Sequence, residues 1–173
     1  MHRPANSGSC YVKTFQAPLS VYKKYKRGGY PKLDLNAFKD KYIRFGAYGD
    51  PAAVPVFIWE ALANQASKFT GYTHQWKSCD LRLQKYCMAS TDNQVEYFQA
   101  KTAGWRSFRV RLETDNLLPH EIICPASPEA GHKLTCSQCT ACNGGNKRSN
   151  IAIIVHGTTA NRYKDKIINI AAA

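Results

Sequence analysis

The chain has 173 residues, of which 44% are hydrophobic and 21% charged, and its formal charge at pH 7 is +12. This length and composition are typical of one folded domain with a sizeable core, and they exclude wholesale disorder. No apolar run approaches the roughly 20 residues of a membrane-spanning helix, and the first ten residues lack the apolar stretch of a secretory signal. We therefore expect a soluble, cytoplasmic protein.

Positive charge is concentrated near the N-terminus. Ten of the 24 Lys and Arg residues, but only two of the twelve acidic residues, precede Phe45. A field of this kind attracts polyanions, nucleic acid above all, although it can also serve solubility alone. We name four residues as candidate nucleic-acid ligands: Lys23, Lys24, Lys26 and Arg27.

These four residues lie on a predicted short basic helix, residues 17–27, which Gly28-Gly29 should end. Leu19, Tyr22 and Tyr25 recur at helical spacing. We expect that side of the helix to pack inward while the lysines face water.

Beyond residue 41 the pattern alternates between strands and helices. Apolar or aromatic runs ended by turn residues predict strands at 42–48, 71–76, 85–90, 105–112, 121–124 and 151–156. Helices are predicted at 54–67, with Pro55 in the first turn, and from Asp92 or Asn93 to residue 103. Such alternation favours right-handed crossovers and parallel pairing. The predicted fold is α/β, a partial (β/α) barrel or an open, mainly parallel sheet of about six strands.

The expected organisation is a single domain over residues 1–173. It comprises a basic helical segment at 1–41, a β/α core at 42–123, a metal-binding loop at 124–145, and the last strand with the C-terminal tail at 146–173.

Polar residues stand at several predicted strand ends, where α/β folds gather their ligands. From these ends, which also include Ser90, we select five candidates for a catalytic pocket: Asp50, His74, Asp92, Arg109 and His156. Helix capping explains the two aspartates equally well, and a lone strand histidine is often structural. On the strand 105–112, alternation separates Phe108 and Val110 from an Arg109-containing face that either meets solvent or lines a lumen.

The chemically most specific pattern is the run TCSQCTAC, which places Cys136, Cys139 and Cys142 at the spacing C-x2-C-x2-C. Cys124, at a predicted strand end and followed by Pro125, can complete four thiolate ligands. Clustered thiols in a reducing cytosol are typical of metal sites, so we predict a metal centre here. The triple run favours a four-iron, four-sulfur (4Fe-4S) cluster, and zinc is the alternative.

Three cysteines remain outside this set. Cys79 and Cys87 are predicted to be buried free thiols. Cys10 is a further candidate metal ligand, or else it packs.

Several segments together resemble a group of uncharacterised phage and mobile-element proteins related to the phage gene-product-88-like family. The most specific of these segments are GAYGDP, CPAS and the triple cysteine run, and the resemblance extends from about Cys10 to Gly157. It implies a radical-SAM-like partial barrel with bound metal, encoded by a phage or mobile element and located in the bacterial host cell. In that group a further cysteine pair often lies just upstream of the position of Cys10, and this chain lacks it.

The sequence thus supports two functional hypotheses. The first is an iron–sulfur protein that acts on or binds nucleic acid or a nucleotide. The second is a non-catalytic, zinc-stabilised nucleic-acid-binding module. The oligomeric state does not follow from the sequence.

Overall fold

The computed structural model describes residues 15–145, 148–157 and 160–161. The chain divides into two compact units, one comprising residues 1–34 and 155–173 and the other residues 35–154. In the first unit, helix α1 (Ala17–Lys26) confirms the predicted basic helix. The strands and helices that follow belong to the second unit.

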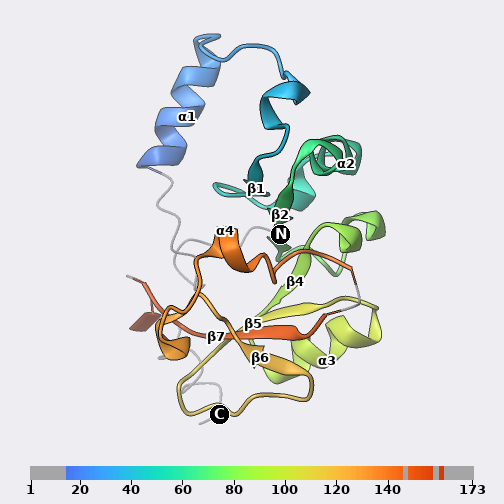
Figure 1. The fold of residues 1–173 in the computed structure, drawn as a ribbon, viewed down its shortest axis with the longest axis vertical. Coiled ribbons are helices and arrows are strands. Elements are labelled where there is room, and N and C mark those ends of the chain that lie inside the picture. The colour runs from blue at the N-terminus through green and yellow to red at the C-terminus, as the bar shows by residue number, and fades with distance from the viewer. Residues whose placement is uncertain (1–14, 146–147, 158–159, 162–173) are drawn as a thin grey trace. The chain divides into compact units, whose positions relative to one another are not determined.

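The second unit is built on parallel strands (Figure 1). A five-stranded sheet has the order β3-β4-β5-β7-β6, and every neighbouring pair in it is parallel. Its strands are β3 (Tyr72–Thr73), β4 (Met88–Thr91), β5 (Ser107–Arg111), β6 (Glu121–Ile123) and β7 (Asn150–Ile154). A second, two-stranded parallel sheet pairs β1 (Tyr42–Arg44) with β2 (Lys68–Thr70). The predicted α/β fold with a mainly parallel sheet is confirmed.

Two predicted strands differ from the structure because of glycines. β1 ends at Arg44, not at residue 48, because the chain turns at Gly46, where φ is +70° and a Cβ would lie 2.5 Å from Pro51 Cδ. The strand expected at 71–76 is instead β3, and β2 precedes it. Gly71 separates β2 from β3, and a Cβ at this position would lie 2.8 Å from Cys87 Sγ.

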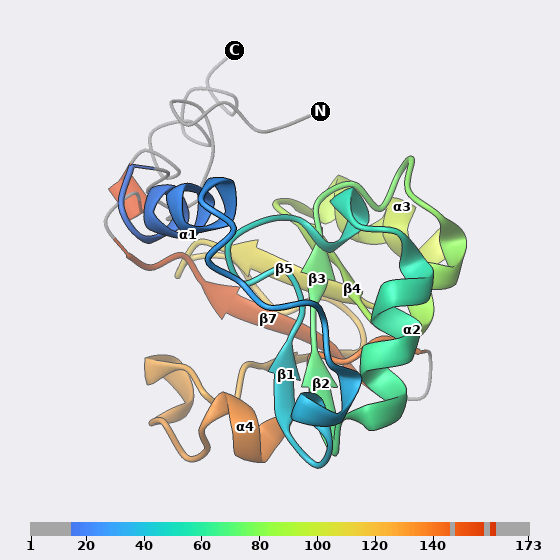
Figure 2. The ribbon, with the colours of Figure 1, turned by 90° about the horizontal axis from the view of Figure 1, so that it is seen from above.

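Both predicted helices of this unit are present within two residues of the expected bounds. Helix α2 (Val56–Gln65) follows Pro55, and helix α3 (Gln94–Thr102) begins after Asn93, whose side chain accepts a hydrogen bond of 2.9 Å from the Glu96 N–H. Figure 2 shows α2 alongside β1 and β2. One short helix, α4 (Cys136–Cys139), lies within the cysteine run. Turns of 3-10 helix occupy Leu35–Phe38, Pro51–Ala53, Leu81–Lys85 and Pro128–Ala130.

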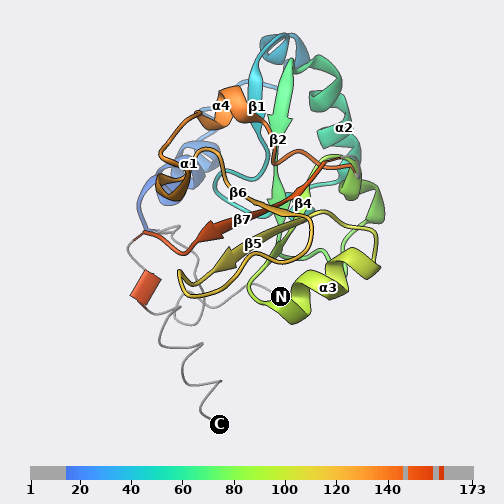
Figure 3. The ribbon, with the colours of Figure 1, turned by 60° about the horizontal axis from the view of Figure 1, so that its bottom comes forward.

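Two apolar clusters cover the two faces of the five-stranded sheet. Ala89 belongs to one and its neighbour Met88 to the other, as the alternation of side chains along a strand requires. The first cluster includes buried residues of both α2 and α3: Phe45, Val56, Leu62, Trp76, Leu83, Cys87, Ala89, Ala100 and Trp105. The second consists of Met88, Cys124, Ile151 and Ile153, with Ala141 and Cys142 packed against it. Figure 3 accordingly shows α3 and α4 on opposite sides of β5 and β7.

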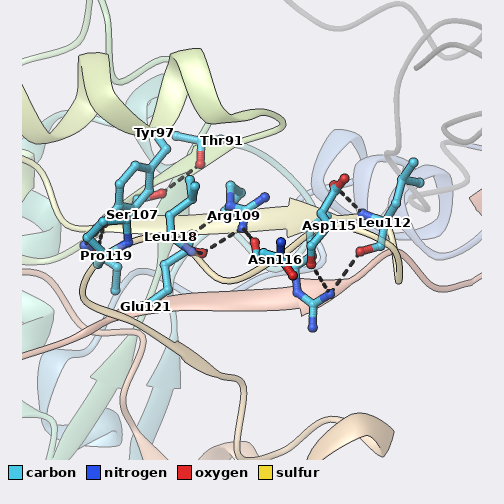
Figure 4. A network of polar contacts seen from close by, with 12 residues as sticks. Thr91, Tyr97, Ser107, Arg109, Leu112, Asp115, Asn116, Leu118, Pro119 and Glu121 are labelled. Atoms are coloured by element: carbon cyan, nitrogen blue, oxygen red, sulfur yellow. Dashed lines mark hydrogen bonds and ion pairs between the residues drawn. The ribbon is translucent and has the colours of Figure 1, made fainter. Parts of the chain in front are cut away.

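On β5 the polar face is the more buried one. Ser107, Arg109 and Arg111 are buried, whereas Phe108 and Val110 are half-buried. Arg109 donates to both carboxylate oxygens of Glu121, at 2.8 and 2.7 Å (Figure 4). Arg111 pairs with Glu129 and also donates to the backbone oxygens of Leu112 and Asp115. Because each of these two arginines has a carboxylate partner, the positive charges on this buried face are balanced.

Among the residues that the structure describes, no helix has both the length and the apolar character needed to cross a membrane.

Candidate metal centre and strand-end site

Cys124 lies in a turn that orients its thiol. It follows β6, and its N–H donates to the Ala152 oxygen of β7 at 2.9 Å. The N–H and the hydroxyl of Ser127 both donate to the Cys124 carbonyl, at 2.9 and 2.7 Å, and close the CPAS segment as a turn. Burial raises the pKa of the Cys124 thiol, while the N–H groups of Ala126 and Ser127, which donate to its sulfur, lower it. Such N–H donors are typical of metal-bound thiolates.

The other three cysteines lie on one helical turn and the residues after it. Thr135 precedes α4, and its N–H donates to the Gln138 side chain at 2.9 Å, in a reciprocal capping arrangement. The helix ends at Thr140, which has a left-handed φ of 50°. Cys136 and Cys139 are thus one turn apart, and the change of direction at Thr140 leads the chain to Cys142.

The four predicted cysteines influence one another electrostatically. Burial, and after it the charges of Cys124, Cys139 and Cys136, raise the pKa of Cys142 to about 12. The pKa of Cys124 is also raised by Cys136 and Cys139. Only neighbouring thiols affect one another in this way.

Within the described ranges, however, no group of three or more His, Cys, Asp or Glu side chains is placed so that it could hold a metal ion. The four thiols are therefore not arranged at coordination distance in this structure.

A buried arginine that the sequence analysis did not select holds the cysteine loop. Arg106 donates to the backbone oxygens of Asn143, Ala141 and Ser149, at 2.7, 2.9 and 2.5 Å. Burial lowers the pKa of its guanidinium, and the Cys142 thiol raises it. The sequence signal is weak, because Arg106 is one of three arginines in WRSFRVRL and nothing in the segment distinguishes it.

Backbone contacts hold the same loop against the sheet. The Gly71 N–H, between β2 and β3, donates to the Cys142 oxygen at 3.0 Å, and the Gly145 N–H donates to the Gln84 oxygen at 2.7 Å. A Cβ at Gly144 would lie 2.3 Å from both the Gln84 oxygen and the Tyr86 nitrogen. The absence of a side chain at Gly144 therefore lets the loop pass close to the backbone of Gln84 and Tyr86.

The remaining cysteines lie elsewhere in the chain. Cys79 and Cys87 are both free thiols, and Cys87 is buried as predicted, whereas Cys79 is only half-buried. Burial raises the pKa of both, to about 11 for Cys79, and the charge of Asp50 adds to each shift. Cys10 lies outside the described residues.

Of the five pocket candidates, the structure joins two. The carboxylate of Asp50 lies 3.7 Å from His74 Nδ1, and it accepts a hydrogen bond of 2.8 Å from the His74 N–H. His74 Nε2 lies 2.9 Å from the hydroxyl of Ser90 on β4. We call Asp50, His74 and Ser90 the strand-end triad.

The other three candidates are placed differently. Arg109 forms an ion pair with Glu121. Its neighbour Phe108 is in register with Ser90, so those two side chains lie on the same face of the sheet. Arg109 therefore faces the side opposite to Ser90. Asp92 follows β4, and its N–H donates to Glu96 at 3.0 Å, while Asn93 is the helix cap. His156 is exposed and belongs to the first unit.

Helix α1 carries the four predicted nucleic-acid ligands on a surface with no buried residue. Its last turn contains Lys23, Lys24 and Lys26, at the end of the helix where positive charges interact favourably with the helix dipole. Arg27 follows as the C-terminal cap. The expectation that its tyrosines pack inward is wrong for the described structure, because Tyr22 and Tyr25 are 56% and 68% exposed. Lys24 Nζ lies 4.8 Å from the ring centre of Tyr30.

Comparison with protein-family models, with curated proteins and with solved structures finds no match to this chain. The fold alone defines it as an α/β protein with a mainly parallel sheet, on which a cysteine-rich loop covers part of one face.

Proposed function

We propose that the protein binds a 4Fe-4S cluster through Cys124, Cys136, Cys139 and Cys142, and that it binds or acts on nucleic acid or a nucleotide. The observation that carries the metal proposal is that Cys142 packs against the apolar cluster that contains Cys124, so thiols from two separate stretches of chain approach the same place. Four adjacent thiols are a strong ligand set for a soft metal centre.

The ligand pattern favours iron and sulfur over zinc. A C-x2-C-x2-C run with a remote cysteine followed by proline is the pattern of bacterial four-iron ferredoxins. Cys124 packs with Met88, Ile151 and Ile153, which gives one side of the centre the apolar surroundings that a cluster requires. Zinc remains the alternative, since four thiolates also satisfy its tetrahedral preference.

Four protein ligands leave no iron open to a substrate. The proposed role is therefore structural or in electron transfer. When bound, the cluster would join the end of β6 to the loop whose Cys142 carbonyl already accepts a hydrogen bond from Gly71.

The metal proposal is tested by anaerobic purification with analysis of iron, sulfide and zinc. We expect about four irons and four sulfides per chain and a brown colour. Cys139→Ser should remove most of the iron, whereas Cys79→Ser, a change at a half-buried thiol outside the set, should leave it unchanged. A colourless protein with one zinc per chain would replace the cluster with a zinc site, and a metal-free folded protein would refute both.

The nucleic-acid part of the proposal rests on helix α1, where three lysines and an arginine accompany two exposed tyrosines. Cations neutralise phosphates, and exposed aromatic rings can stack on unpaired bases. No residue of helix α1 is buried, which supports a role for its surface in binding.

The test is binding to single- and double-stranded oligonucleotides at several salt concentrations. Changing Lys23, Lys24, Lys26 and Arg27 together to Gln should weaken binding, and the slope of log affinity against log salt should fall by about 3. The matched control changes four exposed lysines of the other unit: Lys39, Lys68, Lys85 and Lys101. Equal losses in the two variants would mean that net charge, not helix α1, determines affinity.

A further inference from the structure

The strand-end triad has the connectivity of a nucleophilic catalytic triad. Ser90 Oγ lies 2.9 Å from His74 Nε2, and His74 Nδ1 faces Asp50 Oδ2 at 3.7 Å. When Nδ1 carries the ring proton and points it toward the carboxylate, Nε2 is the acceptor for the Ser90 hydroxyl. The Asp–His distance is longer than a hydrogen bond, as is common in catalytic sites without substrate.

The carboxylate is held in a fixed orientation. Asp50 Oδ1 accepts from the Ala52 N–H at 2.9 Å and from the Thr73 hydroxyl at 2.5 Å, and Oδ2 accepts from the His74 N–H at 2.8 Å. Burial by itself would raise the pKa of Asp50, but hydrogen bonds from His74, Thr73 and the Ala52 N–H outweigh it and lower that pKa to about 2. Asp50 is thus a permanent negative charge beside the imidazole.

The three residues also lie where α/β folds place their chemistry. Asp50 follows β1, His74 follows β3, and Ser90 is near the carboxyl end of β4. Ser90 is two residues beyond Met88 and so faces the side of the sheet opposite to α3. Ligand sites in parallel sheets form at this edge of the strands.

We infer that Asp50, His74 and Ser90 are a catalytic triad that hydrolyses a small carboxylic ester or a similarly activated acyl compound, with Ser90 as the nucleophile. This activity is separate from the proposed metal and nucleic-acid functions and requires neither.

The reaction needs only the groups named and water. Ser90 Oγ forms a bond to the ester carbonyl carbon while its proton moves to His74 Nε2. The alcohol oxygen takes that proton as its bond to the carbonyl carbon breaks, which leaves Ser90 acylated. Water then adds to the acyl carbon and gives a proton to His74. The bond between the acyl carbon and Ser90 Oγ breaks, the proton returns to Ser90, and the carboxylic acid is released. Asp50 stabilises the imidazolium at both stages.

Exposure restricts the size of the substrate. Ser90 is only 4% exposed, whereas the His74 side chain is 39% exposed, so the acyl group must reach Ser90 past the edge of the imidazole. We therefore expect acetyl-sized groups to react and long acyl chains to be excluded.

The experiment uses methanesulfonyl fluoride, a reagent of about the size of an acetyl group that sulfonylates activated serines with loss of fluoride. Incubation of the full chain, followed by peptide mass spectrometry, should place one adduct on Ser90. The internal control is Ser107, which is also a buried strand serine and should remain unmodified. Its hydroxyl forms a hydrogen bond with Thr91 and not with a histidine.

Variants then test the role of each partner. His74→Asn should slow modification about 100-fold, and Asp50→Asn about tenfold or more. His120→Asn, a change at another exposed histidine, should leave the rate unchanged. Folded wild-type protein that gives no adduct on Ser90, or a His74→Asn variant modified at the wild-type rate, would overturn the inference. Neither result depends on whether Ser90→Ala folds.

Discussion

The cysteine loop and the strand-end triad are assembled in different ways. Three of the four cysteines lie within seven residues of sequence, and long-range contacts with Arg106, Gly71 and Gln84 hold their loop. The triad joins residues 24 and 16 positions apart through hydrogen bonds of 2.8 and 2.9 Å, and Ala52 and Thr73 also donate to Asp50. The comparison shows that a local motif can depend on distant support, whereas a dispersed site can be stabilised by contacts among its members and their sequence neighbours.

The largest effect that this comparison predicts is at Arg106. Arg106→Ala leaves three backbone carbonyls without their donor and opens a cavity, so we expect a loss of about 3–5 kcal/mol in the free energy of unfolding. Metal content should fall with it. Chemical denaturation and metal analysis measure the two effects. A loss below about 1 kcal/mol with full metal content would show that the loop does not depend on Arg106.

A somewhat smaller effect is expected at Gly144. Gly144→Ala places a Cβ about where the backbone of Gln84 and Tyr86 already lies, so the loop must move away. We expect a destabilisation of about 2–3 kcal/mol, comparable to other overpacking changes. Gly49→Ala is the matched control, because a Cβ at Gly49 meets no atom within 4 Å. Equal effects at the two glycines would contradict the close packing of the loop.

The smallest effect concerns the pH dependence of the triad. The pKa of Asp50 is about 2 in the folded protein and near 4 in an unfolded chain, so its ionised form favours folding above pH 4. That contribution is lost as pH falls through the folded pKa. The difference in unfolding free energy between wild type and Asp50→Asn should shrink by about 1 kcal/mol from pH 5 to pH 3. Denaturation at both pH values measures it, and a constant difference would show that Asp50 is not held as described.

Much of the fold follows from local patterns in the sequence. The positions of helices α2 and α3 agree with the prediction. Pro55 and Asn93 are strong signals for the start of a helix, and apolar residues at helical spacing follow each of them. The strand bounds were less accurate. β2 is only three residues long and contains Lys68, so it carries too little apolar signal to be recognised.

Parallel pairing could be predicted because strands and helices alternate along the chain. The order of the strands was not predicted, and β7 lies between β5 and β6. Which face of β5 is buried could not be predicted, because alternation separates Arg109 from Phe108 without saying what packs on either side. The prediction that Tyr22 and Tyr25 pack inward was wrong for a related reason. Apolar side chains at helical spacing share one side of a helix, but the spacing does not supply a surface that would cover that side. Tertiary structure alone placed Ser90 against His74, because a contact across two strands depends on register, which no local pattern of residues encodes.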